Sequence, residues 1–175
     1  MYKLTNINIV LAFVFLTLGC SHNEAESRNG RTVDPGESLI KTNRYLVKSE
    51  IEDIDNYIRR HQWEMQETGS GLRYMIAEQG SGPKVKEDDV ITLRYNLWLI
   101  NGDLVYNSND DGPKTFHVGK GGVESGLEEG VLLLHEGDKA RFILPAHLAH
   151  GLLGDEKKIP PRTAIVYELE LIKIN

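Results

Sequence analysis

Between Glu37 and about Glu67 the apolar residues recur at steps of three, four or seven positions. These steps match one face of an α-helix, so the segment has the pattern of an amphipathic helix. The apolar positions of this face are Ile40, Val47, Ile51, Ile54, Ile58 and Met65. We therefore predict a long helical arm over residues 37–68.

The pattern leaves two features of this arm open. Ser49 and Glu52 have the spacing of a capping box, which also fits two helices with a joint near Lys48. A helix of this length needs a partner for its apolar stripe. The C-terminal domain, a second copy of the chain in a homodimer, and a client protein all fit that role.

After Gly69-Ser70-Gly71 the apolar period changes from that of a helix to two. Alternate residues are apolar from Leu72 to Ile76 and again from Ile91 to Leu99, the pattern of half-buried strands. The second run ends at Asn101-Gly102, a dipeptide that favours a tight turn between antiparallel strands. A second domain is expected to begin here and to cover residues 69–175.

The rest of this domain alternates in the same way. Strand patterns recur at residues 114–118, 139–144 and 164–174, and only residues 125–135 have a helical pattern. We expect an α+β domain in which a mostly antiparallel sheet curls around one short helix and buries its Leu-rich side.

The first 20 residues have the order of an export signal. Lys3 precedes an apolar run from Ile7 to Leu18, which is shorter than the roughly 20 residues that span a bilayer. Cys20 is the only cysteine of the chain and follows Gly19, and its position resembles the acceptor of bacterial lipoprotein signals. We expect cleavage before Cys20 and attachment of lipid to it, which would anchor the protein to the cell membrane or the outer membrane on the periplasmic side.

Composition adds two expectations. Residues 21–36 are almost free of apolar side chains, which predicts a flexible tether. The net charge is −6, and only Lys3 among the charged residues lies in the signal, so the mature chain is more acidic still. An acidic chain disfavours nucleic acid as a partner.

Residues 69–175 resemble the family of FKBP-type peptidyl-prolyl cis/trans isomerases along their whole length. The most specific matches are the Gly-Leu-Glu-Glu-Gly run at 126–130, the turn Glu136-Gly137-Asp138, and Ile159-Pro160-Pro161 before the last strand. The order of signal, helical arm and single divergent domain resembles the gliding-motility-associated FKBP-type lipoproteins of Bacteroidetes.

The resemblance implies catalysed rotation about X-Pro bonds of polypeptide clients, with no cofactor and no metal. Amide resonance makes that barrier about 18–20 kcal/mol, and a dry aromatic pocket lowers it by favouring the twisted, less polar amide. The implied catalytic residues are Tyr95, Tyr106, Asn107, His150 and Tyr167, and the implied substrate-binding residues are Val123, Glu124, Leu127 and Ile159. Residues 150–158 correspond to a mobile flap.

Four of these positions depart from the usual pattern of the family. Leu127 stands where tryptophan is frequent, Asn107 where aspartate is, Glu124 where isoleucine is, and His150 where tyrosine is. An asparagine removes a charge, and a histidine donates through a ring nitrogen that titrates near neutrality. The leading hypothesis is an isomerase that assists folding of exported proteins, and the alternative is a catalytically weak chaperone or an adaptor in a cell-envelope complex.

Overall fold

The computed structural model describes residues 35–175, and the expected signal, Cys20 and the tether up to residue 34 lie outside this range. Residues 39–175 form one compact unit. No helix within the described range has the length and apolarity needed to cross a membrane.

The helical arm is one continuous helix, α2, from Pro35 to His61. The two-helix interpretation is therefore wrong. The helix begins within the expected tether and ends seven residues before the predicted end at residue 68. It stops because Gln62 adopts a left-handed backbone (φ 54°) and Trp63 N–H donates back to the Ile58 carbonyl at 3.1 Å. This is the hydrogen-bond pattern that closes many helix C-termini.

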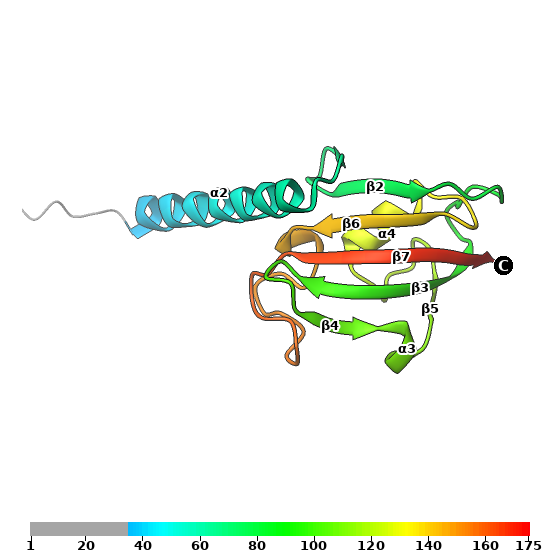
Figure 1. Cartoon of the computed structure of the whole chain (residues 1–175). Coiled ribbons are helices and arrows are strands. Elements are labelled where there is room, and N and C mark those ends of the chain that lie inside the picture. The colour runs from blue at the N-terminus through cyan, green and yellow to red at the C-terminus, as the bar shows by residue number, and fades with distance from the viewer. Residues whose placement is uncertain (1–34) are drawn as a thin grey trace, which may run out of the picture. The chain divides into compact units, whose positions relative to one another are not determined.

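The sheet has seven strands, and Figure 1 shows its central members side by side. The strands are β1 (Gln66–Glu67), β2 (Arg73–Glu78), β3 (Val90–Leu99), β4 (Leu104–Asn107), β5 (Lys114–His117), β6 (Lys139–Leu144) and β7 (Ile165–Ile174). Their order is β1-β2-β6-β7-β3-β4, β5 pairs with β3, and every pairing is antiparallel. The predicted α+β architecture is confirmed, although the two residues of β1 fall where the helical arm was expected.

Two short helical segments were not predicted. They are α3 (Ser108–Asp111), directly after β4, and the 3-10 turn η1 (Ala146–Leu148), directly after β6. Each is a single turn, too short for the 3.6-residue period to show in the sequence.

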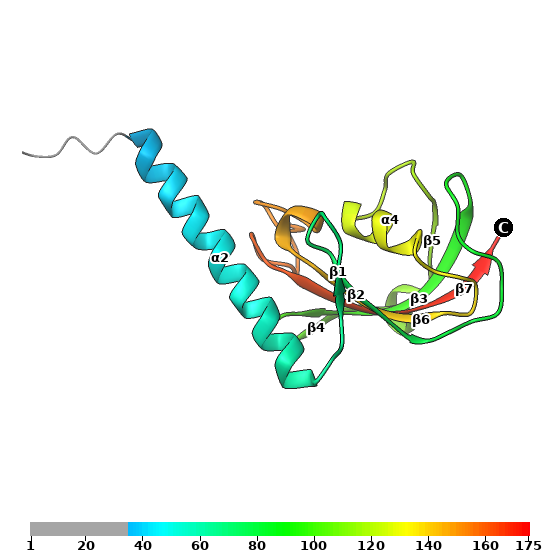
Figure 2. The same ribbon diagram turned by 90° about the horizontal axis from the view of Figure 1, so that it is seen from above.

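Helix α4 (Ser125–Val131) covers one face of the sheet, as Figure 2 shows. It is shorter than the predicted 125–135 because the chain is already extended at His135, which forms a bridge with Lys84. Gly126 and Gly130 lie one turn apart and face β6, where an added Cβ would come within 2.6 Å of Leu144 and 2.5 Å of Phe142. The two glycines therefore let the helix lie directly on the strand.

The sheet is apolar on both faces at one end. Phe142 and Tyr167 belong to the core beneath α4, whereas Ile143 and Val166 belong to a second cluster with Ile54 of α2. The exposed fraction of Ile54 is 2%. Full burial of one such side chain contributes about 1.5–3 kcal/mol, so the second half of α2 is held firmly.

Candidate active site

A cavity of about 270 Å³ opens between the sheet and the start of α4. Its walls are Tyr95 and Leu97 of β3, Tyr106 of β4, Lys114 of β5, Glu124 before α4, Tyr167 of β7, and His150, Asp155 and Lys157 of the loop between η1 and β7. Its volume is near the lower end of the range for small-molecule sites, about 300 Å³.

Strand register brings the aromatic wall together. Leu97 of β3 pairs with Tyr106 on one side and with Tyr167 on the other, so these three side chains lie in a row across three strands. Tyr95 lies two residues along β3 on the same face, and its ring centroid is 5.9 Å from that of Tyr167. Residues two apart share a face of a strand, so the alternation along β3 already places Tyr95 and Leu97 on the same face.

Tyr167 is fully buried in the floor of the cavity. Its hydroxyl donates to Glu124 Oε1 at 3.0 Å and accepts from Lys114 Nζ at 3.1 Å. Burial, followed by the negative charge of Glu124, raises the pKa of Tyr167 well above its ordinary value. The phenol therefore stays neutral and acts as a fixed hydrogen-bonding group.

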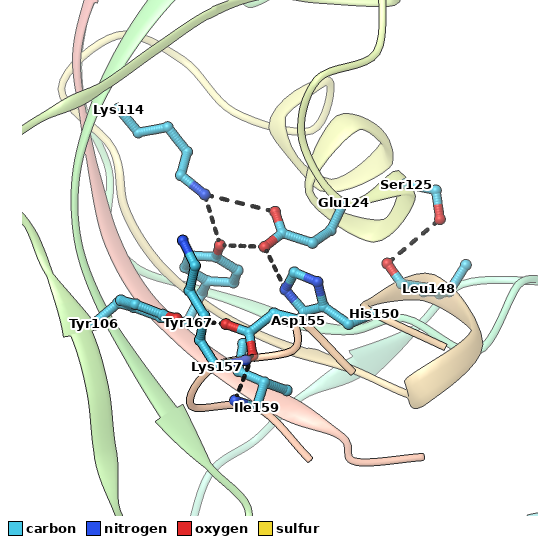
Figure 3. A network of polar contacts seen from close by, with 10 residues as sticks. All are labelled: Tyr106, Lys114, Glu124, Ser125, Leu148, His150, Asp155, Lys157, Ile159 and Tyr167. Carbon is cyan, nitrogen blue, oxygen red and sulfur yellow. Dashed lines mark hydrogen bonds and ion pairs between the residues drawn. The ribbon is translucent and has the colours of Figure 1, made fainter. Parts of the chain in front are cut away.

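Glu124 is the centre of a polar cluster inside the cavity (Figure 3). Its side chain is only 8% exposed, and its Oε1 accepts from Tyr167 and lies 3.1 Å from His150 Nε2. Its Oε2 is buried without a hydrogen-bond partner among the described residues and lies 3.6 Å from Lys114 Nζ. A buried carboxylate needs such partners because desolvation of an unpaired charge is costly.

Lys114 places its ammonium over two of the aromatic rings. Its Nζ is 5.2 Å from the ring centroid of Tyr95 and 5.5 Å from that of Tyr167, within the range of cation-π attraction. The wall of the cavity therefore carries a positive charge next to its aromatic rings.

Asp155 fixes the loop that closes the other side of the cavity. Its carboxylate accepts from the Tyr106 hydroxyl and from the backbone N–H groups of Lys157 (2.9 Å) and Ile159 (2.7 Å). Burial opposes ionisation, but these hydrogen bonds outweigh it and lower the pKa of Asp155 to about 2. Burial and the neighbouring Asp155 raise the pKa of Tyr106 to about 12.

The structure brings five of the nine site residues that the resemblance implied to the cavity wall. These are Tyr95, Tyr106, Glu124, His150 and Tyr167. Val123, Leu127 and Ile159 pack in the apolar cluster that contains Tyr167, and Leu127 and Ile159 are 0% and 3% exposed. None of the three is among the residues that line the cavity.

Asn107 does not line the cavity, although it was expected among the catalytic residues. Its side-chain oxygen accepts from the backbone N–H of Asn109 (2.9 Å) and Asp110 (3.1 Å), and its amide donates to the Asp110 carboxylate (2.7 Å). These are the contacts of a helix N-cap, so Asn107 holds α3 instead of facing the rings.

Four further residues of the cavity were not among the predicted site residues: Leu97, Lys114, Asp155 and Lys157. For Lys114 a signal existed. It lies two and four residues before the buried Phe116 and Val118, so the alternation of the strand places all three side chains on the inner face. Asp155 and Lys157 lie in an irregular loop, where no periodicity predicts direction.

A second hollow, of about 350 Å³, runs along β2, β6, β7 and β3. Its charged side chains pair with one another, as in Arg141–Glu168 (2.9 Å) and Lys139–Glu78 (2.8 Å). The side chains of these pairs are 32% to 66% exposed and each charge already has a partner, so the aromatic cavity is the better candidate for chemistry.

A curled antiparallel sheet over one short helix, with tyrosines converging beside the helix, defines a domain of the FKBP class. The family model described as FKBP-type peptidyl-prolyl cis-trans isomerase matches residues 82–172. The chain belongs to this family.

Individual relatives agree with that assignment. A probable FKBP-type peptidyl-prolyl cis-trans isomerase FkpA of Neisseria meningitidis is 40% identical over 108 residues, which are 61% of this chain and 39% of that protein. FK506-binding protein 1A of Emericella nidulans is 38% identical over 108 residues, 60% of this chain and 99% of that protein. The crystal structure of FkpA from Escherichia coli superimposes with a TM-score of 0.65 at 26% identity, covering 80% of this chain and 65% of that one.

Proposed function

We propose that the protein is a peptidyl-prolyl cis/trans isomerase that acts on proline-containing polypeptides and assists their folding. The observation that carries this proposal is the convergence of Tyr95, Tyr106 and Tyr167 on one cavity. Family membership and the relatives named as isomerases support it.

The chemistry needs no nucleophile, because no bond breaks. Rotation about the prolyl C–N bond removes amide resonance, and the twisted amide is less polar than the planar one. Rings that stack on the proline and give no hydrogen bond to the carbonyl oxygen favour the twisted form, which lowers the barrier. Tyr106 suits this role because its hydroxyl is held by Asp155, which leaves its ring to face the cavity.

The test is a protease-free isomerisation assay of the full chain with a short prolyl peptide. Tyr106→Ala should lower kcat/KM at least about tenfold because one aromatic wall is lost. Tyr106→Phe keeps the ring and is the matched control, which should retain most of the rate. No catalysis above the uncatalysed rate in the wild-type protein would refute the proposal.

The second candidate function is that of a chaperone or adaptor with weak catalysis. The polar cluster of Glu124, Lys114 and His150 favours it, because these charges occupy a cavity that the reaction needs dry. Suppression of aggregation of an unfolded client by a chain that lacks measurable isomerase activity would favour this candidate over the first. Resemblance to gliding-motility lipoproteins makes an envelope complex the setting to examine.

We further propose that Cys20 carries lipid and that the domain lies on the periplasmic side of the cell membrane or the outer membrane. The apolar run Ile7–Leu18 and the position of Cys20 support this. Cys20→Ala should prevent incorporation of labelled fatty acid and move the protein to the soluble fraction. Unchanged fractionation and labelling would refute the anchor.

Self-association through α2 is a separate proposal. Its first half exposes large apolar residues, including Ile40 (61%) and Val47 (48%), seven positions apart on one face. Removal of the whole arm would be a poor test, because it would also uncover Ile143 and Val166 of the sheet. The double variant Ile40→Lys, Val47→Lys leaves that contact intact, and sedimentation should show a dimer for the parent chain and a monomer for the variant.

A further inference from the structure

The carboxylates of the cavity have more hydrogen-bond partners within the protein than its ammonium groups have. Both oxygens of Asp155 are occupied by Tyr106 and by backbone N–H groups, and Oε1 of Glu124 is occupied by His150 and Tyr167. The carboxylates of the cavity therefore obtain their partners from the protein itself. Among their oxygens, only Glu124 Oε2, buried and facing Lys114, has no hydrogen bond to a residue of the described range.

The ammonium groups have unused capacity. Lys114 Nζ has three N–H donors, of which the Tyr167 hydroxyl takes one and Glu124 Oε2 attracts a second at 3.6 Å. The Lys157 ammonium makes no hydrogen bond or ion pair to any residue within 35–175, and its side chain extends toward the cavity (Figure 3). The free donors at this site are thus cationic.

The two carboxylates of α3 already have hydrogen-bond partners. Asp110 and Asp111 of α3 are bonded to the side chain and the backbone N–H of Asn107, respectively, and neither lines the cavity. His150, at 27% exposure, can add positive charge but no negative charge.

A prolyl ring that stacks on Tyr95 and Tyr167 must displace the Lys114 ammonium from the faces of those rings. The ammonium then loses its cation-π contacts and needs another acceptor within reach. A carboxylate on the residue next to the proline supplies one and leaves Lys114 close to Glu124.

We propose that Lys114 and Lys157 make this site selective for prolines flanked by an acidic residue. The inference rests on the proposed isomerase function and specifies its substrate class: polypeptide segments with glutamate or aspartate directly before or after the proline. Lys114 and Lys157 are specificity-determining residues, and the aromatic rings perform the catalysis.

The test compares peptides that differ only in charge, with the full chain at pH 7 and low salt. Glutamate and glutamine have the same shape, so the pair Ala-Glu-Pro-Phe and Ala-Gln-Pro-Phe isolates the charge before the proline, and Ala-Ala-Pro-Glu-Phe and Ala-Ala-Pro-Gln-Phe isolate it after the proline. The kcat/KM for one glutamate peptide should exceed that of its glutamine partner by about fivefold, the size of one partly exposed ion pair. The preference should weaken with added salt.

Lys114→Met keeps the length of the side chain and removes its charge. It should abolish most of the glutamate preference, measured as the ratio of kcat/KM for the glutamate and the glutamine peptide of each pair, and Lys157→Met should reduce this ratio in part. The matched control is Lys120→Met. Lys120, like Lys114, precedes α4 in the chain, but it does not line the cavity and pairs with the exposed Asp88. This variant should keep the preference of the parent chain.

The outcomes separate the two proposals. Equal rates for glutamate and glutamine peptides in both pairs would overturn the acidic preference and leave the isomerase function standing. If no peptide is isomerised, the isomerase function fails, and binding of the same peptides followed by NMR shifts decides the preference on its own: tighter binding of a glutamate peptide upholds it, and equal binding overturns it.

Discussion

Two regions of the molecule each bury a carboxylate, and they do so in different ways. Asp138, 1% exposed at the turn between the end of α4 and β6, accepts from the backbone N–H of Gly80 (2.6 Å) and of His135 (2.7 Å). Glu124, 8% exposed at the cavity, is held by side chains alone within the part of the chain that the structure describes, those of Lys114, His150 and Tyr167.

The two carboxylates differ in whether their hydrogen-bond donors can move. Backbone donors belong to the fold and have no other state, so Asp138 stabilises two loops permanently. The side chains of Lys114 and His150, each 27% exposed, can rotate toward a ligand, so these two partners of Glu124 can be shared with a substrate. A buried carboxylate is thus structural or functional according to the kind of donor it meets, and its exposed fraction alone does not distinguish the two.

The largest effect is expected for Asp138→Ala. The N–H groups of Gly80 and His135 would be left without their acceptor, which should lower the free energy of unfolding by about 2–4 kcal/mol. Urea denaturation measures this. Asp138→Asn retains one acceptor oxygen and should cost less, and a loss below about 0.5 kcal/mol for the alanine variant would show that Asp138 is not a structural carboxylate.

A smaller effect is expected at Glu50, which accepts from the backbone N–H of Ala146 at 2.6 Å and so resembles Asp138. Glu50→Ala should lower the free energy of unfolding by about 1 kcal/mol. Glu52 is the matched control on the same helix, because it is 63% exposed and pairs only with Lys48. If Glu52→Ala costs as much as Glu50→Ala, the contact with Ala146 carries no stability.

Asp155 accepts hydrogen bonds from both kinds of donor, the Tyr106 hydroxyl and two backbone N–H groups, and its pKa reports their combined effect. Its folded-state pKa of about 2 lies below the ordinary value of 3.8, so its contribution to stability is fully present above about pH 4 and is lost as pH falls through 2. Carboxyl NMR titration should find the midpoint near 2. In Tyr106→Phe the midpoint should rise toward 3.8, and an unchanged midpoint would mean that the Tyr106 hydroxyl does not hold this carboxylate.

The smallest effect on stability is expected for Glu124→Gln. The variant removes a buried charge, and Lys114, already 27% exposed, can turn its ammonium to water. The free energy of unfolding should change by less than about 1 kcal/mol, because the lost attraction is offset by the removed desolvation cost of the carboxylate, and the remaining Lys114 charge can be hydrated. A loss larger than that of Asp138→Asn in the same urea experiment would contradict the comparison.

Much of the fold was predictable from the sequence. The alternation from Ile91 to Leu99 predicts β3, Asn101-Gly102 predicts the turn to β4, and the three- and four-residue steps up to Ile58 predict α2. The tyrosines of the cavity were predicted by resemblance. The ends of α2 and α4 were not, because the left-handed backbone of Gln62 and the bridge of His135 with Lys84 depend on contacts that no periodicity reports.

The sequence by itself determined the long strands, the helical arm and the helix after residue 124, and which apolar residues of the long strands face inward, because side-chain direction follows the local period of the chain. Only the tertiary structure decided that Asp155 meets Tyr106, that Lys114 and Glu124 share one cavity, and that Asn107 turns away from it to cap α3. These contacts depend on strand register and loop path, which arise from packing across the whole domain, and no local pattern encodes them.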